Sequence, residues 1–307
     1  MPSRSFAASS GATGQYLIGT APFDNNMTTY TLTSWVFPTA VPDFASGAYF
    51  PVIWKGLDSS GARDLQGPSM SIYSDGSGNL QLWCDQTYDT QDASVFTLLT
   101  GQLVLNSWNL ISFVVSPGVA KAYVNGVEVV YDSGLSHPAI GTPDDDSANP
   151  WTISVDIPGD SVSSSFQGQI SDTRIYTRAL SGAELLQLAT FVNPSSSGLS
   201  AEWKMCGNSP EVDSVSGHNL TVHLATISGN QPHAFCTSTA YSVPDCRDYA
   251  TFPNAARNIQ GTLIYDVQTS SNSAVPGIDS RTEGAPVDSN SSLPINSRTP
   301  GVFGPGE

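Results

Sequence analysis

The acidic residues are the first candidates for catalysis, because retaining glycosidases cleave sugars with two carboxyl groups held about 5 Å apart. The glutamates, however, are scattered singly along the chain, and none lies two or three positions from another. They are Glu128, Glu184, Glu202, Glu211, Glu283 and Glu307. This spacing argues against a pair of glutamates on one strand, and a catalytic pair of aspartates is the alternative that stays open.

The other reactive residue types do not fall into an established catalytic spacing. The sequence has no Gly-x-Ser-x-Gly elbow, no His-Glu-x-x-His pair and no glycine-rich loop before a Lys-Ser or Lys-Thr pair. The histidines lie in turns or at strand ends, where a hydrogen-bonded or exposed imidazole is the usual role. They are His137, His218, His223 and His233. We therefore predict that the protein is not an enzyme, with no catalytic residues and no bound cofactor.

Two acidic clusters contain the residue type that calcium prefers, since calcium binds several oxygen atoms from loops. One comprises Asp85, Asp89 and Asp92, and the other is the run 144–146, formed by Asp144, Asp145 and Asp146. Neither cluster repeats an established ligand spacing, and carboxylates in loops are commonly solvated. We therefore predict no metal site in either cluster.

The tryptophans are candidates for stacking on sugar rings. Four of them lie within strand-like apolar runs and are expected in the core: Trp35, Trp83, Trp108 and Trp203. The other two are Trp54 beside Lys55 and Trp151 after Pro150. These two are the better candidates for an exposed face that meets a sugar.

The charge balance excludes some classes of partner. The formal net charge is −16, and the lysines are only Lys55, Lys121 and Lys204, so a phosphate backbone would be repelled. No apolar run approaches the roughly 18 residues of a membrane span, and the N-terminus lacks the apolar stretch of a secretory signal. We predict no nucleic-acid partner, no membrane partner and synthesis in a cytoplasm without a signal peptide.

The cysteines are too few and too scattered for a disulfide framework or a zinc site with paired ligands. They are Cys84, Cys206, Cys236 and Cys246. A bond between Cys236 and Cys246 would close a small loop, and whether it forms stays open.

Composition and local patterns predict an all-β fold. Charged residues make up only 12% of the chain, which favours short strands and turns over amphipathic surface helices. Asn125-Gly126 between apolar runs fits a tight type I′ hairpin turn. The runs with strand-like composition are 30–37, 71–74, 80–83, 108–115, 122–124, 127–130, 199–205 and 220–224. One short helix is expected after Ser181, where Ser181 and Glu184 have the capping-box spacing.

The chain is expected to contain one domain and an appendage. We expect residues 1–235 to form the folded domain, with a core that includes Trp35, Trp108, Phe113, Ile175 and Tyr176. Residues 236–307 are dominated by Ser, Asn, Pro and Gly, apart from the strand-like run 261–266. Such a segment cannot bury enough apolar surface alone to offset its ordering entropy. We therefore predict an extended, irregular C-terminal arm that needs a partner.

Two segments resemble the laminin-G / concanavalin-A-like family, including its pentraxin-like members. A Trp-bearing strand precedes a Tyr-Val-Asn-Gly hairpin at residues 106–128, and an Arg-Ile-Tyr strand leads into an Ala-Leu-Ser helix cap at residues 166–184. The segments 14–17, 198–203 and 213–221 are similar to those of phage and bacterial members, although here the Asp-Ser-x-Ser-Gly turn follows the closing motif. The resemblance covers about residues 5–235. It implies a two-sheet antiparallel jelly-roll sandwich, completed by the late strands.

The family resemblance leaves the function open, because such sandwiches serve as lectins, adhesion modules, glycosidases and virion components. Glycosidases of this family typically carry Glu-x-Asp-x-x-Glu on one strand, which this chain lacks. From the arm and the phage-like form we predict a bacteriophage-type virion structural protein, a capsid decoration or fibre-associated subunit. Its arm would bind other virion subunits or copies of itself. The alternative is a carbohydrate-binding lectin or adhesin module that binds a surface glycan without an assembly role.

Overall fold

The computed structural model describes residues 3–7, 14–46, 48–56, 67–89, 93–96, 103–131, 136–156, 158, 165–207 and 209–232, together with 256–257 and 263–264. The chain divides into two compact units, Met1–Phe252 and Pro253–Glu307. In the second unit, β16 (Ala256–Arg257) pairs antiparallel with β17 (Leu263–Ile264), which lies within the strand-like run 261–266. The rest of the predicted arm lies outside the described residues. Its boundary at residue 236 therefore stays a prediction.

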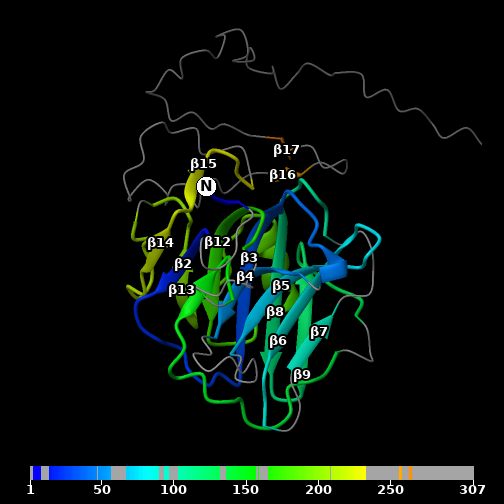
Figure 1. Ribbon diagram of the computed structural model, residues 1–307. Helices are drawn as coiled ribbons and strands as arrows, with labels where there is room; N and C mark the ends of the chain where they lie inside the picture. The colour runs from blue at the N-terminus through cyan, green and yellow to red at the C-terminus, as the bar shows by residue number, and fades with distance from the viewer. Residues whose placement is uncertain are drawn as a thin grey trace, which may run out of the picture. The chain divides into compact units, whose positions relative to one another are not determined.

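The first unit consists of two antiparallel sheets that face each other (Figure 1). The eight-stranded sheet has, in spatial order, β10 (Val127–Glu128), β9 (Val119–Val124), β8 (Asn109–Ser116), β3 (Tyr30–Pro38), β12 (Gly168–Tyr176), β1 (Ser3–Phe6) and β15 (Thr226–Ser228), and β13 (Leu199–Trp203) also pairs with β12. The seven-stranded sheet has the order β14 (Leu220–His223), β2 (Tyr16–Gly19), β11 (Trp151–Ile153), β4 (Phe50–Lys55), β5 (Ser69–Ser74), β6 (Leu80–Gln86) and β7 (Ala93–Phe96). A 3-10 turn, η1 (Phe44–Ser46), precedes β4. The predicted two-sheet jelly-roll sandwich is confirmed.

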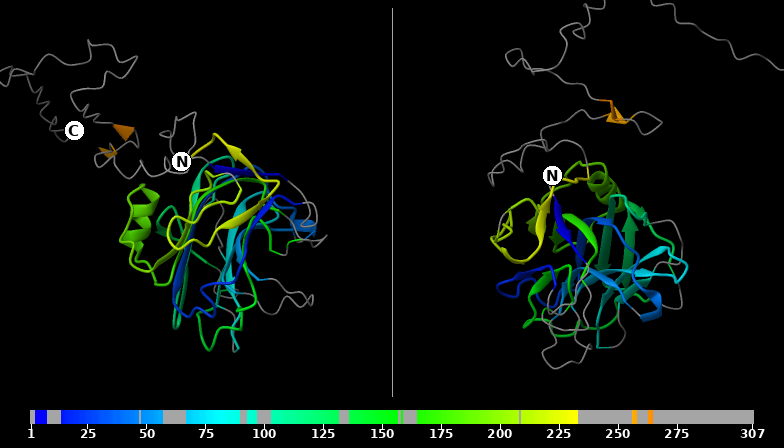
Figure 2. Two further views of the ribbon diagram at one scale, coloured as in Figure 1. Left: turned by 90° about the vertical axis from the view of Figure 1, so that its left-hand side faces the viewer. Right: turned by 45° about the horizontal axis from the view of Figure 1, so that its top comes forward.

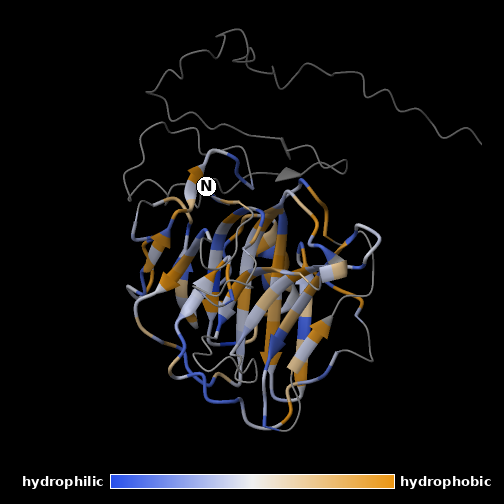
Figure 3. Cartoon of the chain, in the orientation of Figure 1, coloured by the Kyte–Doolittle hydropathy of each residue, from blue (hydrophilic) through white to orange (hydrophobic). Residues whose placement is uncertain are grey.

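The core lies between the two sheets and is filled by alternate side chains of their strands. Successive residues of a strand point to opposite faces, so β5 directs Met70 and Ile72 into the core and Ser71 and Tyr73 to the outer face. Figure 3 shows the resulting mixture of apolar and polar positions along the strands. The alternation therefore leaves a second face on each sheet for other contacts.

A β-bulge in β12 changes which residues of that strand point inward. The register opposite β3 shifts between Ser171 and Arg174, and Asp172 takes a positive φ of 43°. The extra residue reverses the alternation, so both Ile170 and Ile175 reach the core although they are five positions apart. Asp172 and Arg174 are consequently held side by side, as their direct hydrogen bonds show.

Helix α1 (Gly182–Ala189) covers part of the outer face of the eight-stranded sheet (Figure 2). The predicted capping box is present: the Ser181 hydroxyl accepts the Glu184 amide, and the Glu184 carboxylate accepts the Ser181 amide at 2.8 Å. Leu185 and Leu188 pack with Trp35 in a second, smaller apolar cluster. The described part of the chain contains no helix that is long and apolar enough to cross a membrane.

The late strands complete the same sandwich, as the sequence predicted. Strand β13 pairs with β12, β14 pairs with β2, and β15 pairs with β1. A buried ion pair adds to this closure, because Arg4 of β1 binds Glu211 at 2.8 Å between β13 and β14. The first strands of the sandwich thus pair with its last strands in both sheets, β1 with β15 and β2 with β14.

The expected core is confirmed except at one position. Trp35, Phe113, Ile175 and Tyr176 are buried, whereas Trp108 is only half-buried and lies just before β8. Its ring packs against Phe37, and its indole N–H donates to Asn230 at 3.4 Å. A residue at the end of a strand lacks cover from a neighbour on one side, which explains the difference.

Candidate functional site

Four aromatic side chains form a row on the outer face of the seven-stranded sheet. Tyr49 precedes β4, Trp54 lies in β4, Tyr73 in β5 and Trp83 in β6. Ring centroids are 6.1 Å apart for Trp54 and Tyr49, 5.1 Å for Tyr49 and Tyr73, and 4.7 Å for Tyr73 and Trp83. These spacings are close to the distance between strands. The four residues, called the aromatic row below, therefore cross three neighbouring strands.

Polar groups adjoin the aromatic row. Ser71 lies opposite Trp83 in the strand register and shares its sheet face with Tyr73. Ser71 is 3% exposed, and its buried hydroxyl has no hydrogen-bond partner in the described part of the chain. An unpaired buried hydroxyl costs about 1–3 kcal/mol. The phenol of Tyr49 donates to the carboxylate of Asp156, which is itself buried.

The structure contradicts the expectations for Trp83 and Trp151 and confirms only the sheet face expected for Trp54. Trp83, predicted in the core, is half-buried in the row. Trp151, predicted on an exposed face, is completely buried, because it faces inward opposite Lys55 and donates its indole N–H to the Phe23 carbonyl at 3.2 Å. Trp54 does lie on the outer face, although only 8% of it is exposed. Trp35 and Trp203 are buried, as expected.

Tyr49 and Tyr73 were not singled out from the sequence. The signal that could have identified Tyr73 is the alternation of apolar and polar residues in β5 and β6. Tyr73 and Trp83 both lie at positions that alternate with the apolar core residues of their strands. For Tyr49 the sequence carries no comparable signal, because it precedes its strand.

A buried ammonium occupies the centre of the second acidic cluster. The Nζ of Lys55 donates to the Asp24 carbonyl at 2.9 Å, to Asn25 Oδ1 at 2.8 Å and to Asp146 Oδ1 at 2.9 Å. Burial lowers the pKa of Lys55, and the charge and hydrogen bond of Asp146 oppose this effect. The buried carboxylate of the 144–146 run is thus already paired with a cation.

Among the described residues, Asp146 is the carboxylate that forms an ion pair with this ammonium. Asp145 is exposed, and hydrogen bonds from Ser147 lower its pKa. Asp89 is exposed and accepts the Thr142 amide at 2.8 Å, while Asp92 lies outside the described residues. Within those residues, no group of three or more His, Cys, Asp or Glu side chains is placed to hold a metal ion. That calcium is not bound stays a prediction.

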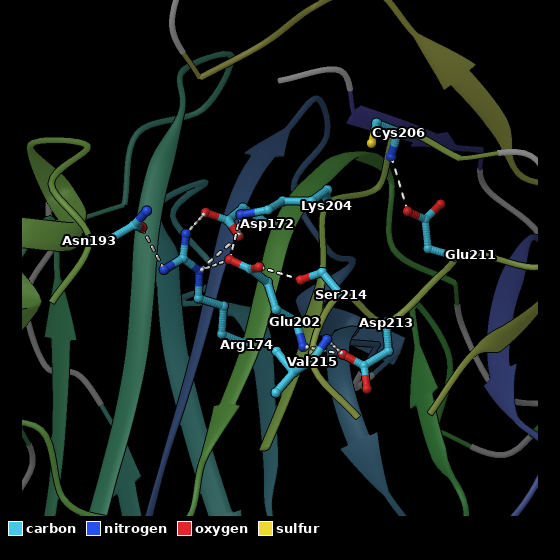
Figure 4. A network of polar contacts seen from close by, with 10 residues as sticks. All are labelled: Asp172, Arg174, Asn193, Glu202, Lys204, Cys206, Glu211, Asp213, Ser214 and Val215. Atoms are coloured by element: carbon cyan, nitrogen blue, oxygen red, sulfur yellow. Dashed lines mark hydrogen bonds and ion pairs between the residues drawn. The ribbon is translucent and has the colours of Figure 1, made fainter. Parts of the chain in front are cut away.

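A second polar cluster connects β12 with β13 (Figure 4). The guanidinium of Arg174 donates to both oxygens of Asp172, to Asn193 at 2.9 Å and lies 3.1 Å from Glu202. Burial raises the pKa of Asp172, but the positive charges of Arg174 and Lys204 outweigh burial and lower the pKa overall. Asp172 is therefore held as a charged partner of Arg174.

The Asp-Ser-x-Ser-Gly turn is organised by its aspartate, which Figure 4 also shows. One oxygen of Asp213 accepts the amides of Glu202 and Val215, and the other accepts the amides of Ser216 and His218. A carboxylate with four backbone donors fixes a turn. The role of this motif is therefore structural.

The glutamates of the described part are all used in ion pairs. Glu128 binds Lys121, Glu184 binds Arg178, Glu202 binds Arg174 and Lys204, and Glu211 binds Arg4. Glu283 and Glu307 lie outside the described residues. The structure thus does not bring glutamates together as a catalytic pair in the part it describes.

The described histidines have packing contacts. His218 stacks on Phe23 with centroids 3.8 Å apart, and His223 stacks on Tyr16 at 4.3 Å. The backbone of His137 pairs with Ser94, and His233 lies outside the described residues.

One cysteine of the described part is free and one is oxidised. Cys84 is free, and burial raises the pKa of its thiol. Cys206 takes part in a disulfide bond whose second cysteine lies outside the described residues. The pair Cys236 and Cys246 also lies outside them.

Several solved structures share this fold. A presumed carbohydrate binding protein from Bacteroides ovatus has a TM-score of 0.53 at 18% identity, over 74% of this chain and 59% of that protein. A heptameric SAP-like pentraxin from Limulus polyphemus has a TM-score of 0.52 at 13% identity, over 74% of this chain and 94% of the pentraxin. Tailspike protein 2 of the Escherichia coli O157:H7 bacteriophage CAB120 reaches only 0.46 at 12% identity, over 66% of this chain and 28% of the tailspike, which is too low to support an inference.

The first two likenesses establish a shared fold and nothing more, because both identities are low. No curated protein sequence matches the chain. Residues 10–186, more than half of the sequence, match the family described as the concanavalin A-like lectin/glucanases superfamily. This match agrees with the two-sheet sandwich and with the strand and hairpin motifs of the sequence. The chain belongs to the concanavalin A-like lectin/glucanases superfamily.

Proposed function

We propose that the protein binds carbohydrate on the outer face of the seven-stranded sheet. The observation that carries this proposal is the aromatic row with the unpaired Ser71 hydroxyl beside it. Sugar rings have apolar C–H faces and polar edges, so sugar sites combine aromatic surfaces with a few hydrogen-bonding groups. Tyr49, Tyr73 and Trp83 are partly exposed and supply the first feature. The Ser71 hydroxyl is buried and supplies the second only if a neighbouring side chain shifts when the sugar binds.

The fold supports this proposal in a general way. Family members include lectins by name, and one structure of similar fold is described as a presumed carbohydrate binding protein. Fold alone does not decide function, so the weight rests on the aromatic row. A row that crosses three strands also offers more surface than one sugar ring covers. We therefore expect oligosaccharides to bind more tightly than monosaccharides.

We further propose that binding occurs without hydrolysis. Cleavage of a glycosidic bond needs one carboxyl group that can donate a proton. The glutamates of the described part are engaged by arginine or lysine, and the positive partners of Asp172 lower its pKa. A catalytic pair of aspartates would be detected as release of reducing sugar. We expect no release from any glycan that the protein binds.

A glycan array of the full-length protein and its Tyr73→Ala variant tests the binding proposal. Wild-type protein should bind a restricted set of oligosaccharides, and the variant should lose that signal because the centre of the row is removed. Circular dichroism of both proteins checks that the variant is folded. An array without any selective signal, or an unchanged signal in the folded variant, contradicts the proposal.

The assembly role is a second proposal, and it rests on residues 236–307. Their apolar residues are widely spaced and could fill separate pockets on a neighbouring subunit. These residues are Phe252, Leu263, Ile264, Tyr265, Ile278, Leu293, Ile295 and Phe303. A virion subunit that binds a surface glycan would need both features. Co-purification of the full chain with phage particles, lost when residues 237–307 are deleted, supports this role, and normal incorporation of the deleted form contradicts it.

A further inference from the structure

We infer that the edge of β15 is a self-association site, at which two copies of the chain pair their β15 strands across a two-fold axis. β15 ends the eight-stranded sheet, and in the described part of the chain it pairs only with β1 (Figure 1). An edge strand presents backbone N–H and C=O groups that can bind another strand. The inference does not depend on carbohydrate binding, because the aromatic row lies on the other sheet.

The other edges of the two sheets are covered or charged in the described part of the chain. The backbone of β14 exchanges two hydrogen bonds with Glu211, and that of Ser94 in β7 exchanges two with His137. β10 has only two residues, and its Glu128 forms an exposed ion pair with Lys121. Covering segments, short strands and charges are common protections against strand addition. β15 is also short, with three residues, but it carries no charge and no described segment covers its edge.

The sequence around β15 is uncharged, although the chain has a net charge of −16. None of the residues 214–232 is Asp, Glu, Lys or Arg, and Arg4 of the neighbouring β1 is buried in its ion pair with Glu211. Like charges oppose the association of two copies of an acidic protein. A two-fold contact brings a surface against itself, so an uncharged edge avoids this repulsion. This self-complementarity favours a second copy as the partner.

Exposed apolar side chains at the edge add a driving force for association. Ile227 in β15 is 39% exposed, and Leu224 in the preceding turn is 71% exposed. Pairing of two β15 strands would remove part of this apolar surface from water. A three-residue strand nevertheless makes a small contact, below the roughly 1,200 Å² at which standard stable interfaces begin. We therefore expect a weak dimer, with a dissociation constant in the micromolar range or above.

Sedimentation equilibrium of the full-length protein at physiological salt tests the inference. Wild type is compared with Ile227→Lys and with the matched control Val127→Lys, since Val127 lies on the opposite edge strand and is 66% exposed. Wild type should dimerise with rising concentration. Ile227→Lys should raise the dissociation constant of the dimer about tenfold or more, because it sets two ammonium groups at one small contact. Val127→Lys should leave this constant unchanged.

Three results of this experiment overturn the inference. They are a wild type that stays monomeric up to about 1 mM, a dissociation constant that is unchanged in Ile227→Lys, and equal losses in the two variants. Circular dichroism of both variants checks that they are folded.

Amide hydrogen exchange of the wild-type protein distinguishes strand pairing from a contact of side chains alone. Backbone pairing protects amides, so peptides that contain Thr226–Ser228 should exchange more slowly well above the dissociation constant than well below it. Peptides that contain Val127–Glu128 should exchange equally at both concentrations. This measurement needs no substitution, so it decides the inference even if Ile227→Lys does not fold. Exchange at β15 that does not depend on concentration overturns the pairing of the strands.

Discussion

The ammonium of Lys55 and the carboxylate of Asp146 form an ion pair at 2.9 Å, with side chains 0% and 1% exposed. The two residues lie 91 positions apart in the sequence. Their pairing places the ammonium among the oxygen atoms of Asp24, Asn25 and Asp146. The same ammonium lies 5.7 Å above the ring of Trp151, which is buried in the core.

Removal of Lys55 should destabilise the sandwich strongly. Lys55→Met leaves the Asp146 charge buried without a partner, which typically costs about 3–5 kcal/mol. The matched control is Lys121→Met, because the Lys121–Glu128 pair is 41% and 40% exposed and such pairs contribute about 0–1 kcal/mol. Urea denaturation measures both free energies of unfolding. Equal losses in the two variants would show that the buried pair does not stabilise the fold.

Calcium should not raise the stability of the protein. A ligand that binds only the folded state increases the melting temperature by mass action, and the cation position at Asp146 is taken by Lys55. We expect calcium and chelator to leave the melting temperature within a few degrees. A larger rise that is lost in Asp144→Ala/Asp145→Ala, or in Asp85→Ala/Asp89→Ala, would reveal a calcium site in the corresponding cluster.

The cap of helix α1 should weaken in acid. Hydrogen bonds from Arg178 and Ser181 lower the pKa of Glu184 from its ordinary value of 4.5 to about 2. A carboxyl group with a depressed folded-state pKa stabilises the fold above its unfolded pKa, and this contribution disappears as the pH falls toward about 2. Glu184→Gln should therefore be less stable than wild type at pH 7, with the difference closing between about pH 4.5 and 2. A difference that stays constant in urea denaturation across this range contradicts the assignment.

Burial predicts which of two tryptophan substitutions lowers the free energy of unfolding more. Trp203 is fully buried and donates to the His218 carbonyl at 2.8 Å, so Trp203→Ala should cost about 3–5 kcal/mol. Trp108 is half-buried, and Trp108→Ala should cost distinctly less. Chemical denaturation of both variants gives the comparison. A larger loss for Trp108→Ala would mean that the strand end at residue 108 is packed more tightly than the structure shows.

Local features of the fold could be predicted from the sequence, because their signals lie within a few residues. The Asn125-Gly126 turn has φ angles of 53° and 79°, as the type I′ pattern requires, and the Ser181 capping box forms as expected. The aromatic row could not be predicted in this way. Its members come from three strands, and their alignment depends on the register of β4, β5 and β6. The Lys55–Asp146 pair likewise depends on long-range packing.

Isothermal titration calorimetry with the strongest array ligand is the most direct test of glycan binding by the aromatic row. Trp83→Ala is compared with Trp108→Ala, since both tryptophans are half-buried but Trp83 alone belongs to the row. Loss of an aromatic ring costs about 1–3 kcal/mol in binding where nucleic-acid bases stack on it. A similar loss for a stacked sugar corresponds to about a fivefold or larger rise in Kd. We predict this rise for Trp83→Ala and an unchanged Kd for Trp108→Ala. An unchanged Kd in folded Trp83→Ala, or equal losses in both variants, would contradict binding at the row.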